Sequence, residues 1–289
     1  MRLLVTNDDG VHAPGLAAIA RALAAWAADG PDREVLVTAP LANHSGASAA
    51  VGTVYEREAV AYRAVPIDGA DGVMVYGLDA SPALTVIIGA LGGFGRRPDL
   101  VVSGINLGVN VGRSVLHSGT VGAALTGAQL GLSGMAVSMR AGGQCDHWET
   151  ASALAVALLP TLAAAPPRTV LNLNVPSVPP EDLRGVRRGR ISTAGLIKAA
   201  AGNRPGTAPP QGGPGTGGDP DEGEIRLVLG TAIPSLGSVE GEDPEDDAAL
   251  IAAGFASLTA LRGVREDTAD GADDLVRTAV ADLQATLAG

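Results

Sequence analysis

The sequence predicts a doubly wound α/β fold, in which helices cover both faces of a largely parallel, Rossmann-like sheet. Short apolar runs of strand length alternate with longer Ala- and Leu-rich runs, and polar loops follow several of the short runs. Strands that alternate with helices form parallel sheets, because each helix returns the chain to the same edge of the sheet.

The alternation places five strands and four helices in the first part of the chain. The expected strands span 3–6, 34–39, 99–103, 135–139 and 169–173. The expected helices span 14–28, 81–91, 118–130 and 147–164. Pro14 suits the opening turn of the first helix, since the N–H that proline lacks has no helical acceptor there.

The last third of the chain is organised differently. Residues 199–223 are rich in Gly, Pro and polar residues, a composition that buries too little apolar area to become ordered. The β-like segments 186–193 and 225–229 flank it, so we expect a projecting β-hairpin arm with a flexible tip. A short helix, a strand at 255–260 and a terminal helix near 269–287 should follow. The expected domains are a core at 1–185, an arm at 186–240, and a C-terminal strand and helix at 241–289.

Composition limits the classes of partner. The chain has 289 residues, is 46% hydrophobic but only 2% aromatic, and carries a net charge of −11. One large core filled by Ala, Val and Leu is therefore expected. The negative charge argues against DNA, whose binding proteins gather clustered Lys and Arg. It does not exclude a small phosphate ester, because a cation and backbone N–H groups supply positive potential locally.

The sequence also indicates a cytoplasmic protein without a membrane partner. Cys145 is the only cysteine, so neither an intramolecular disulfide nor a Cys-rich zinc site can form. The N-terminus enters a strand directly and lacks the features of a signal peptide. The longest apolar stretch, 151–165, contains Pro160 and is too short to span a bilayer.

Two adjacent acids follow the first expected strand. Asp8 and Asp9 precede Gly10, at the carboxyl edge where open parallel sheets bind ligands. Mutual repulsion would raise the pKa of one acid, whereas a divalent cation removes the repulsion and uses both as oxygen ligands. The alternative is that the pair only caps and shapes a turn.

Two further polar loops should converge on the paired acids. Ser45 follows the second strand and Asn106 follows the strand at 99–103, so both lie at carboxyl ends of strands. Carboxylate, hydroxyl and amide oxygens suit Mg²⁺ or Mn²⁺ better than zinc. We therefore expect a metal site at Asp8, Asp9, Ser45 and Asn106, although Ser45 or Asn106 taken alone is more typical of a turn.

A helix of small residues opens at Ser118, Gly119 and Thr120. Free N–H groups at a helix N-terminus bind anions, so we expect phosphate there, with simple N-capping by Ser118 as the alternative. His12 and His44 lie in the loops of the expected site. A histidine in a loop is more often structural, but either ring is placed to contact a substrate.

Two other functions lack their essential residues. Glycines recur every four residues at 104, 108 and 112, which is neither a dinucleotide fingerprint nor a phosphate-binding loop of the ATPase type. A receiver-like signalling domain also pairs acids after its first strand. It needs a phosphorylatable Asp after a later strand, and the run 98–106 ends without one.

The motifs of the chain resemble the SurE nucleotidases, also called survival protein E. The resemblance lies in LVTNDDGVHAPG at 4–15, NHSGA at 43–47, PDLVVSGINLGVN at 98–110 and SGTVGAA at 118–124, with a weaker match at 247–259. The segments cover the core to about residue 176 and the final third in outline. The first and third are highly specific.

The resemblance implies a metal-dependent phosphatase of 5′- and 3′-nucleoside monophosphates, with one Mg²⁺ or Mn²⁺ per subunit. It carries metal ligation onto Asp8, Asp9, Ser45 and Asn106, and phosphate binding onto Asn43 and the turn at 118–120. It also implies a homodimer or homotetramer built through the C-terminal arm.

Three departures from the family pattern concern the substrate. His44 stands where Arg is common, His117 stands where Tyr is common, and residues 77–82 differ from the usual Gly-Thr-Pro motif. His117 is therefore a further candidate substrate contact. A phosphatase specialised for a phosphorylated pathway intermediate is an alternative, as is a non-catalytic phosphate-binding protein. Either a metal-activated water or one of the paired aspartates would attack phosphorus.

Overall fold

The computed structural model describes residues 1–52, 54, 58–141, 146–192, 197–199, 229–231, 243–264 and 271–288. Its strands are β1 Arg2–Thr6, β2 Glu34–Pro40, β3 Tyr62–Ala64, β4 Met74–Leu78, β5 Leu100–Leu107, β6 Ser133–Met139, β7 Val170–Val175, β8 Val186–Arg188, β9 Ile197–Ala199, β10 Leu229–Thr231 and β11 Ala256–Leu261. Its α-helices are α1 Pro14–Ala28, α2 Pro82–Ala90, α3 Gly119–Gln129, α4 Trp148–Ala164, α5 Asp247–Ala252 and α6 Ala272–Ala288, with short 3-10 turns at Gly112–His117 and Pro180–Asp182.

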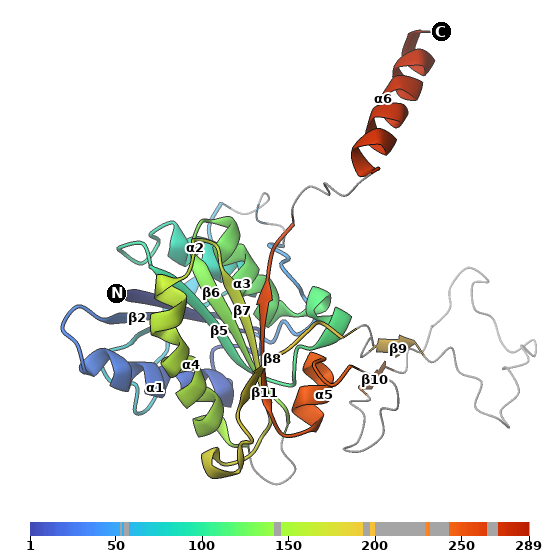
Figure 1. Ribbon diagram of the computed structural model, residues 1–289. Helices are drawn as coiled ribbons and strands as arrows, with labels where there is room; N and C mark the ends of the chain where they lie inside the picture. Colours follow the sequence, from blue (N-terminus) through green and yellow to red (C-terminus); the bar gives the residue numbers. More distant parts are fainter. Residues whose placement is uncertain are drawn as a thin grey trace, which may run out of the picture.

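The main sheet has the order β3-β4-β2-β1-β5-β6-β7-β11-β8 (Figure 1). Strands β4, β2, β1, β5, β6 and β7 are parallel, whereas β3 and β11 run antiparallel to β4 and β7. From β1 the chain builds outward first toward β2 and then, on the other side, from β5. The carboxyl ends of β1 and β5 therefore flank the switch point of a doubly wound sheet, where such folds bind ligands.

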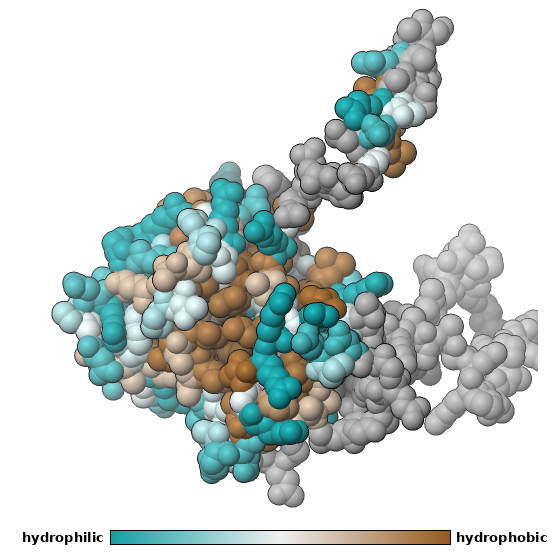
Figure 2. Space-filling view, in the orientation of Figure 1, coloured by the Kyte–Doolittle hydropathy of each residue, from teal (hydrophilic) through white to brown (hydrophobic). Residues whose placement is uncertain are grey.

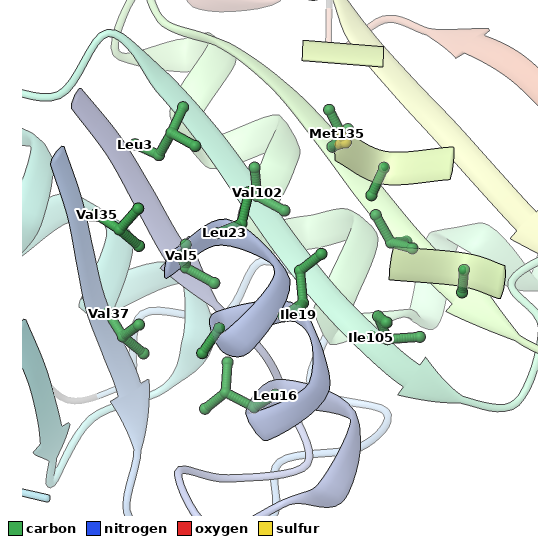
Figure 3. Packing of buried hydrophobic residues seen from close by; sticks show 14 of the residues in the cluster. Leu3, Val5, Leu16, Ile19, Leu23, Val35, Val37, Val102, Ile105 and Met135 are labelled. Carbon is green, nitrogen blue, oxygen red and sulfur yellow. The ribbon is translucent and has the colours of Figure 1, made fainter. Parts of the chain in front are cut away.

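Helices cover both faces of the sheet. Helices α1 and α4 pack together on one face, and α2 and α3 pack together on the other. Figure 3 shows Leu16, Ile19 and Leu23 of α1 against buried residues of β1, β2 and β5. All three side chains have no exposed surface. This spacing of three and four residues is the apolar stripe of a helix that packs on one side.

The predicted fold class is confirmed, and the expected core elements are present within a few residues of their bounds. Strands β3 and β4 were not predicted. β3 is a three-residue edge strand whose side chains are all exposed, so no apolar run marks it. β4 alternates between exposed and buried residues at its start, and its pairing with β2 makes it a strand of the parallel sheet.

The arm differs from its predicted bounds. Val186–Arg188 does not project but pairs in parallel with β11, extending the main sheet. The antiparallel pair of the arm is instead β9 with β10, joined by register pairs such as Ile197 with Thr231. The predicted flexible tip at 199–223 falls almost wholly outside the described residues, as does most of the predicted strand 225–229.

The surface carries apolar residues beside the β8 end of the sheet. Figure 2 shows hydrophobic residues gathered over α4 and the neighbouring strands, inside a hydrophilic rim. Helix α6 extends away from the body in Figure 1, with Leu275 and Val276 exposed.

α4 continues through Pro160, which does not interrupt it. Of the helices in the described ranges, none combines the length and apolarity needed to span a membrane.

Candidate metal and phosphate site

The loop that follows β1 makes a sharp turn at the carboxyl edge of the sheet. Gly10 has φ +101°, which an L side chain adopts only with strain. The side-chain amide of Asn7 donates to the Gly10 carbonyl at 2.8 Å, and the N–H of Val11 donates to Pro40 at 2.7 Å. The turn leaves Asp8 and Asp9 at the switch point between β1 and β5.

Asp8 is buried against the start of α3. Its side chain is 3% exposed, and its Oδ1 accepts a hydrogen bond from the Thr120 hydroxyl at 2.7 Å. A Cβ added to Gly119 would lie 2.7 Å from the Cβ of Asp8 and 2.8 Å from its Oδ2. The first turn of α3 therefore approaches Asp8 closely only because residue 119 has no side chain.

Asp9 lies between the other two loops. The Ser45 hydroxyl is 3.5 Å from Oδ1 of Asp9, and the N–H of Leu107 is 3.4 Å from its Oδ2. Burial, followed by the charge of Asp8, raises the pKa of the Asp9 carboxyl, and the two hydrogen bonds oppose the rise. The loops after β1, β2 and β5 thus converge on one carboxylate that lacks a full counter-charge.

The loop after β2 is fixed to the first by its backbone. The N–H of His44 donates to the carbonyl oxygen of Asp8 at 2.7 Å. Asn43 Oδ1 accepts from the N–H of Ser45 at 2.7 Å, which closes a turn around His44. The side-chain oxygen of Asn43 thus shapes the loop, and its amide N–H groups remain as donors toward an anion.

Asn106 is turned toward the site by an irregularity in β5. The register between β5 and β6 shifts between Ser103 and Asn106. Such bulges re-aim a side chain at the end of a strand. The amide nitrogen of Asn106 donates to the Gly108 carbonyl, so its amide oxygen is the atom that can act as a ligand.

The start of α3 offers backbone donors rather than side chains. Ser118 is the N-cap, and its hydroxyl oxygen accepts from the N–H of Val121 at 3.1 Å. The N–H of Gly122 makes the first helical bond, to Ser118, so the N–H groups of Gly119 and Thr120 precede the helical ladder. The Thr120 hydroxyl is already used by Asp8, which leaves the backbone N–H groups for a phosphate.

The three candidate histidines occupy different positions. His44 is half-buried and lines a cavity of about 350 Å³ beside the loop. His117 is exposed, and its carbonyl accepts from the N–H of Ser48 at 3.2 Å. His12 is exposed, and within the described part of the chain no hydrogen bond joins its ring to the paired acids. Of these three histidines, His44 is the one that lines this cavity in the described part of the chain.

A buried polar cluster that no sequence motif predicts supports the loop between β5 and α3. Asn110 donates to Asn174 and to Ser138, each at 2.7 Å, and accepts from Asn172 at 2.8 Å. Asp247, fully buried, accepts from the N–H groups of Gly112, Ser192 and Ala248 at 2.9 to 3.1 Å. Burial raises the pKa of Asp247, and these hydrogen bonds oppose the rise. The sequence signal is only an Asp at a helix start, the last of the acidic run Glu245, Asp246 and Asp247.

The donors present fit a hard divalent cation. The two carboxylates, the Ser45 hydroxyl and the Asn106 amide are all oxygen donors, and Asp9 has the raised pKa expected when a counter-charge is needed. Among the described residues, no three His, Cys, Asp or Glu side chains cluster. A cation here would consequently depend on hydroxyl and amide oxygens as well as on the paired acids.

Comparisons with known proteins converge on one family. A sequence profile described as Survival protein SurE matches residues 3–197. The chain is 41% identical over 195 residues to a 5′/3′-nucleotidase SurE of Cronobacter sakazakii, covering 67% of this chain and 70% of the relative. It is 36% identical over 264 residues to a 5′-nucleotidase SurE of Stutzerimonas stutzeri, covering 91% and 92%. The crystal structure of the SurE protein from Aquifex aeolicus superposes with a TM-score of 0.70 at 25% identity, over 98% of this chain and 100% of that one.

Proposed function

The chain belongs to the SurE family of survival proteins, and on this premise we propose that it is a phosphoric monoester hydrolase that cleaves nucleoside 5′- and 3′-monophosphates. Two relatives that match it are named as nucleotidases, which favours an enzyme over a non-catalytic phosphate-binding protein. We further propose that one Mg²⁺ or Mn²⁺ per subunit is held by Asp8, Asp9, Ser45 and Asn106.

One observation supports this site above the others. Asp9 lies between the Ser45 hydroxyl and the N–H beside Asn106, while Asp8 lies against the N-terminus of α3. A cation ligand and an anion-binding helix end therefore adjoin the same pair of acids. A phosphate monoester carries two negative charges that both groups would bind.

Different groups of the proposed site would bind the phosphate and orient the metal ligands. A bound divalent cation would neutralise charge on the phosphate oxygens and lower the pKa of a water molecule. The N–H groups of Gly119 and Thr120 would hold the oxygens that become more negative in the transition state. Thr120 keeps Asp8 oriented through its hydroxyl at 2.7 Å. The attacking group would be a water molecule or one of the paired aspartates.

Three further properties are proposals on the same premise. We propose a cytoplasmic enzyme that forms a homodimer or homotetramer through the arm at 186–240. Asn43 is proposed to contact phosphate through its side-chain amide, and His44 to contact the rest of the substrate. A phosphorylated pathway intermediate is the alternative substrate, because residues 77–82 depart from the family pattern close to His44.

A panel of phosphate esters tests the function. With Mn²⁺ present, the protein should hydrolyse 5′- and 3′-nucleoside monophosphates faster than sugar phosphates, and should leave bis(p-nitrophenyl) phosphate intact. A double variant, Asp8→Asn with Asp9→Asn, serves as the control for a contaminating phosphatase. Cleavage of the diester alone, or equal rates for the double variant, would refute the proposal.

A further inference from the structure

The loop after β2 and the segment that leads into α3 meet at Ser48. The loop carries Asn43 and Ser45, and the segment is the 3-10 turn that ends just before α3. The Ser48 hydroxyl donates to the Leu116 carbonyl at 2.7 Å, and the Ser48 N–H donates to the His117 carbonyl at 3.2 Å. Ser48 therefore contributes both its side chain and its backbone to one junction.

The backbone of Ser48 also lies directly on the first turn of α3. A Cβ added to Gly122 would lie 2.3 Å from the carbonyl oxygen of Ser48 and 2.7 Å from the backbone nitrogen of Ala49. A side chain does not fit in so short a gap, so the loop reaches the helix because residue 122 is glycine. Hydrogen bonds and close packing thus act at the same point.

In the described part of the chain, Ser48 supplies both of the hydrogen bonds that join residues 43–50 to the turn before α3. The other hydrogen bonds of this loop join it to itself or to the loop after β1, as in the bond of the His44 N–H to the Asp8 carbonyl at 2.7 Å. The start of α3 is held to Asp8 separately, by Thr120. Without Ser48, the loop would keep its attachment to Asp8 but lose its attachment to the helix.

The backbone of Ser48 has a conformation that is unfavourable for serine. Its φ is +54°, in the left-handed region that residues with a side chain rarely occupy. Glycine adopts this φ without steric cost, but it has no hydroxyl to donate to Leu116. A strained residue beside a candidate site points to a role for its side chain.

From these observations we infer that Ser48 is a positioning residue, whose hydroxyl holds the loop after β2 at a fixed distance from the start of α3. The inference rests on the proposed function and adds a residue to its site. A phosphate between the metal and the helix needs donors from both elements at once, and Ser48 fixes their separation before the phosphate binds. Metal binding depends less on Ser48, because three of the four proposed ligands lie outside this loop.

Removal of the hydroxyl tests the inference. Ser48→Ala keeps the strained φ and Ser48→Gly relieves it, but both variants lose the bond to Leu116. With Mg²⁺ present, both should bind inorganic phosphate about three- to tenfold more weakly than wild type, which is the effect of one neutral hydrogen bond. Equilibrium dialysis with radiolabelled phosphate measures this affinity without turnover.

Thr169→Ala is the matched control. The Thr169 side chain is half-buried like that of Ser48, and its hydroxyl donates at 2.7 Å to the Pro166 carbonyl, beside the amino end of β7 and away from the site. Titration calorimetry with Mn²⁺, without phosphate, provides a second readout. The Mn²⁺ affinity of both Ser48 variants should stay within about twofold of the control, because Ser48 bonds to no proposed ligand.

The possible outcomes separate the inference from the proposed function. Hydrolysis of AMP by both Ser48 variants, with the phosphate affinity of the control, would overturn the inference and leave the function intact. An equal loss of Mn²⁺ affinity would also overturn it. So would normal phosphate binding by Ser48→Gly alone, because the hydroxyl would then only compensate for backbone strain. Weaker phosphate binding by both variants, in a protein that hydrolyses no phosphomonoester, would support the positioning role and refute the function.

Discussion

Thr120→Val removes one hydrogen bond in the candidate site and almost nothing else. The Thr120 hydroxyl donates to Asp8 at 2.7 Å, Thr120 is fully buried, and Asp8 is 3% exposed. Valine has nearly the shape of threonine but cannot donate. A hydrogen bond to a charged acceptor stabilises a protein by about 1.5–3 kcal/mol, so metal-free Thr120→Val should be less stable by about that amount.

The same substitution should weaken metal binding. If Asp8 is a ligand, Thr120 is the group that orients it, and loss of such a partner lowers metal affinity by about 10- to 100-fold. Titration calorimetry with Mn²⁺ measures the affinity, and urea denaturation without metal measures the stability. Thr126→Val is the control, since its hydroxyl donates at 2.7 Å to the Gly122 carbonyl of the same helix and does not reach Asp8.

If the Thr120→Val variant binds Mn²⁺ as tightly as the Thr126→Val control, Thr120 does not orient a metal ligand. A double-mutant cycle with Asp8→Asn sharpens the comparison. In the Asp8→Asn background the Thr120 hydroxyl faces a neutral amide, so Thr120→Val should destabilise by clearly less than in wild type. Equal costs in both backgrounds would mean that Thr120 acts through packing.

Three further predictions follow from the same structure. Asp9→Asn should abolish most activity. Because the pKa of Asp9 is raised in the folded protein, ionisation of Asp9 destabilises the metal-free wild type as pH rises, so the variant should be more stable than wild type near neutral pH. This difference in stability should disappear as pH falls toward 3.8, and urea denaturation across this pH range measures it. Deleting 197–231, which removes the β9–β10 pair and leaves β8 in the main sheet, should lower the mass measured by light scattering, whereas a monomeric full-length protein would contradict assembly through the arm. Asp247→Ala strands the buried N–H groups of Gly112 and Ser192 and should destabilise by at least about 2 kcal/mol, read by urea denaturation, with exposed Asp243→Ala as the control.

The strands that could be predicted from the sequence are those that contain an apolar run of strand length. β1, β2, β5, β6 and β7 are almost entirely buried, and each contains an apolar run of strand length, interrupted by small or polar residues in β5, β6 and β7. β3 lies at an edge with exposed side chains and carries no such signal. The sequence predicts residues 186–193 as a strand of the arm because they and 225–229 are β-like and flank the Gly- and Pro-rich segment. Residues 186–188 instead pair with β11, a strand about 70 residues further along the chain that the hairpin prediction did not take into account.

Part of the candidate site could likewise be predicted from the sequence, and part could not. Convergence of Asp9, Ser45 and the end of β5 could be predicted, because the carboxyl ends of neighbouring parallel strands meet at one edge. The bond from Thr120 to Asp8 joins residues 112 positions apart, and its geometry depends on how α3 packs. The sequence pattern predicts phosphate binding at residues 118–120, which stays a prediction, and the structure adds that the Thr120 hydroxyl donates to Asp8. Such a role requires the three-dimensional structure.

The most direct test of the metal site is hydrolysis of AMP by protein treated with EDTA. We predict that activity disappears after chelation and removal of EDTA, and returns when Mn²⁺ or Mg²⁺ is added, because phosphate charge at Asp8 and Asp9 needs a counter-ion. Elemental analysis of the treated protein shows whether metal has been removed. Undiminished turnover in protein shown to be free of metal would contradict the account.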